Sequence, residues 1–256
     1  MTLPSSFIPK PPPGQNSLPC DDGEPMDTPL HRLQMNVLID SLEDAWAERS
    51  DFYVGGNMFV YFSELQIKNN DFRGPDVFVV LNCERKPRKS WVAWEEGGKL
   101  PDVVIELLSE STANVDRNQK KQLYARVWRL PEYFLFDPES GELEGYRLNG
   151  LKGEYVRIEP EPNGDLQVAT LGLTLGVRPG RIHLQEAPFL RWLSNGKILP
   201  TEREMAAEQR ALAASSSALA EQEKARAEQE MARAESAEAR AKALEAELEL
   251  LRRRGP

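Results

Sequence analysis

The sequence predicts an α/β protein in which helices flank a mixed β-sheet and a long helix follows at the C-terminal end. Short apolar runs rich in β-branched residues, bounded by Gly, Pro or Asn, alternate with stretches of helical spacing between residues 28 and 150. From about residue 201 the composition changes to Ala, Glu and Arg. The 256 residues, 40% of them hydrophobic, suffice for one good-sized core with appendages.

Residues 1–27 are polar and proline-rich, and we expect them to be disordered. They lack a basic stretch leading into an apolar segment, and the chain has no run of eighteen apolar residues. We therefore expect neither a secretory signal nor a membrane span. Cys20 and Cys83 are too few for a disulfide framework, which indicates a cytoplasmic protein.

The first helix should begin at Thr28 and Pro29, a suitable cap and first position, and end before Asp51. The later elements follow from the same patterns: buried strands in 52–62, 75–82 and 101–109, a helix over 112–128, and strands in 132–138 and 143–149. The last two strands should form a hairpin, because Glu139-Ser140-Gly141 between them is a turn sequence. Residues 151–199 suggest shorter β segments and turns.

Three segments result: a disordered arm over 1–27, one α/β domain over 28–200, and a helical tail over 201–256. In the tail, Arg-Ala pairs recur every seven residues at 226, 233 and 240, which favours self-association through a coiled coil. The seam is mostly alanine until Leu244, so a single solvated helix is the alternative.

The net charge of −9 argues against broad nucleic-acid binding. The tail carries 10 basic and 12 acidic side chains, which leaves 22 basic and 29 acidic ones for residues 1–200. Binding along phosphates requires clustered Lys and Arg, and these totals leave room only for a local basic patch.

Two acidic residues occupy unusual positions in the predicted strands. Asp76 stands at the start of the run GPDVFVV, and Glu106 lies inside the apolar run PDVVIELLS. Side chains alternate along a strand, so Glu106 shares a face with Asp102, Val104 and Leu108. A charge there is costly unless it is paired or bound to a metal.

The following helix places Asp116, Lys120 and Tyr124 on one stripe, at i, i+4 and i+8. If this helix packs near the strand end, Lys120 reaches Glu106. Two carboxylates on adjacent strands would then hold a hard divalent cation beside a lysine, an arrangement suited to water attack on phosphate.

These segments closely resemble the Uma-two family of restriction-endonuclease-like proteins, which is abundant in cyanobacteria. The likeness covers about residues 30–199 and is densest in GPDVFVV and in PDVVIELLSESTANVDRNQKKQLYARVWRLPEYFLFDP; it extends to the charged helical tail. The resemblance implies a PD-(D/E)xK nuclease fold, a restriction-endonuclease-like mixed sheet flanked by helices, with a metal site.

Carried over to this chain, the resemblance makes Asp76 and Glu106 the motif carboxylates. Leu108 occupies the place of the usual lysine, so the resemblance points to Lys120, with Lys121 as the second candidate. The first hypothesis is therefore a Mg²⁺-dependent endonuclease, with Mn²⁺ as an alternative ion, acting on DNA. In it Asp76, Glu106 and the Leu107 carbonyl bind metal, and Lys120 positions or activates water.

The second hypothesis is a non-catalytic scaffold whose tail forms a homodimer or binds a partner helix. Under it Asp76 caps a strand, Asp116 and Lys120 form an exposed ion pair, and Glu106 pairs with Arg73, Arg117 or a lysine.

Several other polar residues have structural interpretations. Asp102 should cap its strand, and Glu132, Tyr133 and Asp137 should fix a strand and its turn. His31 suits a surface or capping position, or it lends a side chain to the site. The sequence has neither a Cys/His cluster nor a glycine-rich phosphate loop, which excludes zinc sites and P-loop nucleotide hydrolysis.

Overall fold

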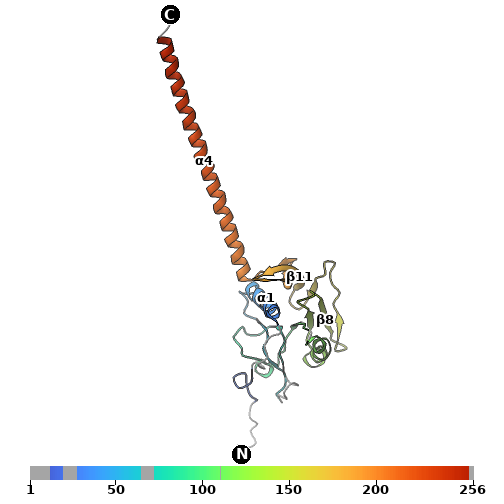
Figure 1. Ribbon diagram of the computed structural model, residues 1–256. Helices are drawn as coiled ribbons and strands as arrows, with labels where there is room; N and C mark the ends of the chain where they lie inside the picture. Colours follow the sequence, from blue (N-terminus) through green and yellow to red (C-terminus); the bar gives the residue numbers. More distant parts are fainter. Residues whose placement is uncertain (1–11, 20–27, 65–71, 110, 254–256) are drawn as a thin grey trace, which may run out of the picture. The chain divides into compact units, whose positions relative to one another are not determined.

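The computed structural model describes residues 12–19, 28–64, 72–109 and 111–253. It divides into two compact units, Met1–Glu202 and Arg203–Pro256. Helix α4 (Glu202–Arg253) is one uninterrupted helix, drawn from orange to red in Figure 1. None of the helices in the described part of the chain combines the length and hydrophobicity that crossing a bilayer requires.

The central sheet of the first unit has six strands in the order β1-β4-β6-β7-β8-β9. Their bounds are β1 (Phe52–Gly55), β4 (Val77–Leu81), β6 (Val103–Leu107), β7 (Glu132–Phe136), β8 (Leu143–Asn149) and β9 (Glu154–Arg157). Strands β6 and β7 are parallel and the other neighbours are antiparallel. The sheet is therefore mixed, and the predicted α/β class is confirmed.

Two smaller sheets accompany it. One has the order β3-β2-β5, with β2 (Val60–Tyr61), β3 (Phe72–Arg73) and β5 (Trp91–Val92), and the short helix η2 (Ala93–Glu95) follows β5. The other has the order β10-β11-β12-β13, with β10 (Leu166–Val168), β11 (Leu173–Ile182), β12 (Gln185–Ser194) and β13 (Lys197–Ile198).

Helix α1 (Pro29–Ala45) begins as predicted: the Thr28 hydroxyl accepts a hydrogen bond from the His31 amide and Pro29 occupies the first turn. The crossover from β6 to β7 is a helical run that alternates between α and π geometry. It consists of α2 (Ala113–Val115), η3 (Asp116–Lys120, π), α3 (Lys121–Leu123) and η4 (Tyr124–Trp128, π). Such π-turns in α-helices occur frequently at functional sites.

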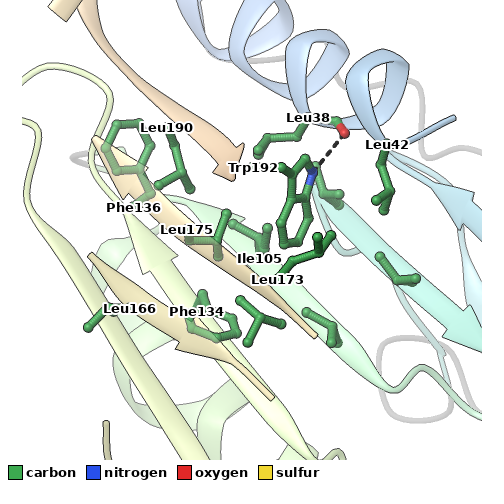
Figure 2. Packing of buried hydrophobic residues seen from close by; sticks show 14 of the residues in the cluster. Leu38, Leu42, Ile105, Phe134, Phe136, Leu166, Leu173, Leu175, Leu190 and Trp192 are labelled. Atoms are coloured by element: carbon green, nitrogen blue, oxygen red, sulfur yellow. Dashed lines mark hydrogen bonds between the residues drawn. The ribbon is translucent and has the colours of Figure 1, made fainter. Parts of the chain in front are cut away.

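Apolar side chains cover both faces of the central sheet. On one face, Ile105 packs in a cluster with Leu38 of α1 and Trp192 of β12. Figure 2 shows the Trp192 indole, whose Nε1 donates to the Leu38 carbonyl at 2.9 Å. On the opposite face, Val104 packs in a second cluster with Tyr124 of the crossover helix.

A buried glutamine also joins α1 to β12. The Gln34 amide donates to the carbonyl of Leu190 at 3.0 Å and accepts from the amide of Leu190 at 2.9 Å. This pair satisfies two backbone groups that would otherwise be buried without partners. Helix α1 is thereby fixed against one side of the fold, with its first turn near the end of β6.

The structure differs from three sequence expectations. Segment 52–62 forms two strands in different sheets, because the chain turns at Gly56-Asn57. Residues 151–199 contain the ten-residue strands β11 and β12, longer than predicted. Residues 12–19, assigned to a disordered arm, contact the small sheet: the Pro19 carbonyl accepts from the Tyr61 hydroxyl at 2.8 Å. Cys20 lies outside the described residues.

Candidate active site

Asp76 and Glu106 lie opposite each other on neighbouring antiparallel strands. Val77 of β4 is paired with Ile105 of β6, so the next pair along the register is Asp76 with Glu106. Asp76 directly precedes β4, and its Oδ2 accepts a hydrogen bond from the Leu107 amide at 2.7 Å. Its own amide lies 3.4 Å from Glu106 Oε2. Like charges at directly opposed positions repel, so this pairing requires a proton or a cation.

Glu106 has no solvent exposure, and the crossover helix supplies its partners. Lys120 Nζ lies 3.0 Å from Glu106 Oε2, and the Tyr124 hydroxyl donates to Glu106 Oε1 at 2.8 Å. The structure thus brings together Asp76, Glu106 and Lys120, the three residues predicted to be catalytic. The sequence suggested Arg73, Arg117 or a lysine as an ion-pair partner of Glu106. In the structure the partner is Lys120, whereas Arg117 pairs with Glu144 at 2.9 Å.

Asp116 is a buried member of this cluster, with an exposed fraction of 1%, and the expectation of an exposed ion pair is wrong. Its Oδ1 lies 2.8 Å from Lys120 Nζ. Its backbone carbonyl accepts from the Tyr133 hydroxyl of β7 at 3.0 Å, which holds the helix to the sheet. The Lys120 ammonium therefore lies between two buried carboxylates on different elements.

Burial dominates the protonation of this cluster. Loss of solvent raises the pKa of Glu106 to about 8, since the attraction of Lys120 only partly offsets it and Asp76 and Asp116 add repulsion. Burial also raises the pKa of Asp76. For Lys120, burial lowers the pKa but the surrounding carboxylates, Glu106 foremost, raise it further, so the net shift is upward. The surrounding carboxylates therefore keep the lysine charged, while burial opposes the ionisation of Glu106.

This pKa shift predicts a pH-dependent stability. An unfolded chain ionises Glu106 near the ordinary pKa of 4.5, whereas the folded protein retains its proton up to about 8. The folded state binds more protons in that interval, so the free energy of unfolding of the metal-free protein should fall as pH rises through it. Glu106→Gln should flatten this dependence. Denaturation in EDTA across the interval measures it, and equal slopes in variant and parent would contradict the assignment.

His31 ties α1 to the end of β6 and is buried, with 5% exposure, so a surface position is excluded. Its Nε2 lies 2.9 Å from the Leu108 carbonyl and its Nδ1 lies 3.0 Å from the Thr28 hydroxyl. Since a carbonyl only accepts, Nε2 carries the hydrogen and Nδ1 accepts from Thr28. The pattern around Thr28 predicted the cap but did not reveal this contact with Leu108, 77 residues away.

A cavity of about 550 Å³ lies at this end of β6. It is lined by Thr28, His31, Leu108, Ser109, Ser111, Ala113, Arg117, Asp137 and Glu139. The lining residues do not include Asp76, Glu106 or Lys120. They do include Leu108, which directly follows Leu107, the residue whose amide contacts Asp76. The cavity therefore adjoins the cluster, and its walls carry hydroxyl groups, one guanidinium, one imidazole and two carboxylates.

Gly56 packs against the backbone of Asp76. A Cβ at this position would collide with the Asp76 carbonyl oxygen and lie 2.7 Å from Ile39 Cδ1 of α1. Gly56→Ala should therefore displace the start of β4 and cost about 1–3 kcal/mol in the free energy of unfolding, as overpacking does. Chemical denaturation measures the loss, with Gly180→Ala as the control because an added Cβ there meets nothing within 4 Å. Equal stability of the two variants would show that Gly56 does not constrain Asp76.

The other polar residues of the motif region make structural contacts. Asp102 Oδ2 accepts from the Leu81 amide at 2.7 Å. Glu132 is buried, pairs with Arg147 at 2.8 Å and accepts from the Thr170 amide at 2.9 Å. Asp137 accepts from the Glu139 amide in the hairpin turn. Lys121 Nζ lies 3.2 Å from the centre of the Tyr146 ring, on another face of the helix from Lys120.

The donor set suits a hard cation that retains water. Among the residues described, no group of three or more His, Cys, Asp or Glu side chains is arranged to hold a metal ion. Two opposed carboxylates and a carbonyl are present: in a strand the N–H and C=O of one residue point the same way, so the Leu107 carbonyl faces the Asp76 side. Mg²⁺ favours a site in which a few protein oxygens bind the ion and water molecules complete its coordination shell.

The comparison with protein families decides the classification. The model of the Uma2 family, described as "Putative restriction endonuclease", matches residues 20–183, well over half of the chain. The chain belongs to the Uma2 family. The resemblance to the Uma-two family stated from the sequence is thereby confirmed, with a match that begins earlier and ends earlier than residues 30–199.

Two relatives come from Synechocystis sp. (strain ATCC 27184 / PCC 6803 / Kazusa). The chain is 30% identical to the protein slr1290 over 126 residues, 48% of this chain and 63% of the relative. It is 28% identical to sll1609 over 111 residues, 39% of this chain and 60% of the relative. The chain thus spans less than two thirds of the length of these relatives.

A solved structure is also similar: the crystal structure of "a putative nuclease belonging to DUF820" from Anabaena variabilis ATCC 29413. Its sequence is 16% identical, the TM-score is 0.42, and the match covers 57% of this chain and 75% of that one.

Proposed function

We propose that this Uma2 protein is a Mg²⁺-dependent endonuclease that hydrolyses phosphodiester bonds in DNA, with Mn²⁺ able to replace Mg²⁺. The observation that carries the proposal is the placement of Lys120 Nζ 3.0 Å from Glu106 Oε2, at the strand position opposite Asp76. Lys120 supplies from the helix the positive charge that the motif lysine would supply from the strand, where this chain has Leu108. The family's description as a restriction endonuclease supports DNA as the substrate.

The roles follow from the contacts. Asp76 and Glu106, with the Leu107 carbonyl, would hold the ion, which polarises the phosphate and lowers the pKa of a bound water. The Leu107 amide orients Asp76 at 2.7 Å, and the Tyr124 hydroxyl orients Glu106 at 2.8 Å. Lys120, kept protonated by its carboxylate neighbours, positions the attacking water and stabilises charge growing on the phosphate oxygens.

The adjoining cavity fits an approach of substrate along the end of β6. Ser109 and Ser111 offer hydroxyl donors there, and Arg117, which pairs with Glu142 and Glu144, adds a guanidinium. The net charge of −9 makes such local groups the ones that must attract the phosphate backbone. We place the reaction in the cytoplasm, where the buried free thiol of Cys83 stays reduced.

Cleavage of supercoiled plasmid by the purified full chain tests the proposal. Nicked and linear products should form with Mg²⁺ or Mn²⁺ and stop when EDTA is added. A protein that binds Mn²⁺ but leaves plasmid, linear and single-stranded DNA intact would instead favour the non-catalytic scaffold, and the enzymatic proposal would fail.

A further inference from the structure

The last part of α4 has a continuous apolar seam that the rest of the helix lacks. Between residues 234 and 251, the positions spaced alternately by three and four are all apolar: Ala234, Ala237, Ala241, Leu244, Leu248 and Leu251. When the same register is continued back through the preceding heptads, one of the two core positions is occupied by polar residues: Gln209, Ser216, Glu223 and Glu230. A packed seam is therefore confined to about the last three heptads.

The leucines of this seam are exposed on the single helix. Leu244 is 60% exposed and Leu248 is 54% exposed. Neither belongs to any of the hydrophobic clusters formed by the described residues. A helix that keeps regularly spaced leucines in water gains stability when a second helix covers them.

The flanking charges identify the second helix. Ala234, Ala241 and Leu248 are the first of the two core positions in their heptads. In a parallel, in-register pair, the residue just before each of them faces the residue five places later on the partner helix. The three pairs formed in this way are Arg233 with Glu238, Arg240 with Glu245, and Glu247 with Arg252, each twice in a symmetric dimer. Every pair joins opposite charges.

An antiparallel pair on the same seam is less favourable. Its layers would match Ala241 with Leu244, which sets Arg240 opposite Glu247 but also sets Glu238 opposite Glu245 of the other chain, whereas every flanking pair of the parallel arrangement is attractive. Repulsion between these carboxylates disfavours the antiparallel arrangement, as like charges flanking a coiled-coil seam do.

We propose that residues 234–253 pair with the same segment of a second copy of this chain as a parallel, in-register coiled coil. The proposal is independent of the endonuclease proposal, because none of its residues belongs to the candidate active site. Its consequence is a dimer that carries two copies of the family domain.

Sedimentation velocity of the full chain over a range of concentrations tests the proposal. The parent should show a concentration-dependent dimer, and Leu244→Asp/Leu248→Asp should raise the dimer dissociation constant at least about 100-fold. Leu212→Asp is the matched control: Leu212 lies on the same helix, is 63% exposed and falls outside the seam. It should leave the dimer unchanged.

Charge reversal tests the orientation. Arg240→Glu should weaken the dimer by placing two glutamates together, and Arg240→Glu/Glu245→Arg should restore it. The proposed seam is refuted if the parent is monomeric or if the dimer survives the changes at Leu244 and Leu248. It is also refuted if Leu212→Asp dissociates the dimer. Failure of the double charge reversal to restore the dimer overturns the parallel register. Plasmid nicking by the monomeric variant reports on the active site separately.

Discussion

Asp76→Asn and Glu106→Gln are each expected to reduce Mg²⁺-dependent DNA cleavage at least about 100-fold, because changes even to the outer partners of metal ligands cost 10–100-fold. Both substitutions keep the size of the side chain and remove the charge that a cation requires. The asparagine carbonyl can still accept from the Leu107 amide, so the end of β4 should keep its position. Initial rates of plasmid nicking measure the effect.

The fold of both variants should remain intact. Glu106→Gln removes a buried carboxyl whose ionisation burial opposes, so its melting temperature at alkaline pH should not fall. Glu142→Gln is the matched control, since Glu142 is exposed and pairs with Arg117 in the same part of the fold at 3.4 Å. It should retain full activity. Undiminished cleavage by both site variants would remove Asp76 and Glu106 from the mechanism.

The second large effect is expected from Lys120→Met, which should destabilise the fold by about 3–5 kcal/mol, the range for breaking a buried ion pair. The change removes the ammonium that lies 2.8 Å from Asp116 and 3.0 Å from Glu106. Both buried carboxyl groups then lose their cationic partner. Cleavage should also fall about 100–1000-fold, as when a transition-state donor is lost. Chemical denaturation and single-turnover cleavage measure the two effects.

Lys121→Met separates the two candidate lysines. Lys121 is partly exposed, and its ammonium lies over the Tyr146 ring. We expect this change to cost at most about 1–2 kcal/mol from the lost cation–π contact, and to leave kcat nearly unchanged. If Lys121→Met abolished cleavage while Lys120→Met remained active and stable, the assignment of the lysine would be reversed.

The apolar runs predicted the framework of the fold because each of its strands carries a strong local pattern. Segments 101–109 and 132–138 each contain a pronounced apolar run, and they form the central strands β6 and β7. The turn at Glu139-Ser140-Gly141 also predicted the β7–β8 hairpin, in which Gly141 adopts a φ of +77°. Local chemistry alone sufficed in these places.

The long hairpin of β11 and β12 could not be predicted in the same way. Pro179 and Pro188 lie opposite each other in its register, and Gly180 lies within β11. These residues normally interrupt strands, so the sequence suggested short segments. The pairing depends on contacts between distant parts of the chain, such as Gln34 of α1 with Leu190 of β12.

The candidate site illustrates the same limit. The positions of Asp76, Glu106 and Lys120 in the motifs suggested that they meet, but their order in space depends on the strand register and on the return of the crossover helix. The burial of Asp116 and the contact of His31 with Leu108 follow from packing that no local pattern records. The i, i+4, i+8 spacing of Asp116, Lys120 and Tyr124 was the available indication of their shared stripe.

A crystal of the full chain soaked in Mn²⁺ gives the most direct test of the central claim, because manganese can be located by its anomalous scattering. We predict one anomalous peak within coordination distance of Asp76, Glu106 and the Leu107 carbonyl, with the Lys120 amine nearby, and no such peak in Glu106→Gln crystals. Well-ordered Asp76 and Glu106 side chains with no ion at saturating Mn²⁺, or a peak bound elsewhere, would contradict a metal-dependent nuclease site at this position.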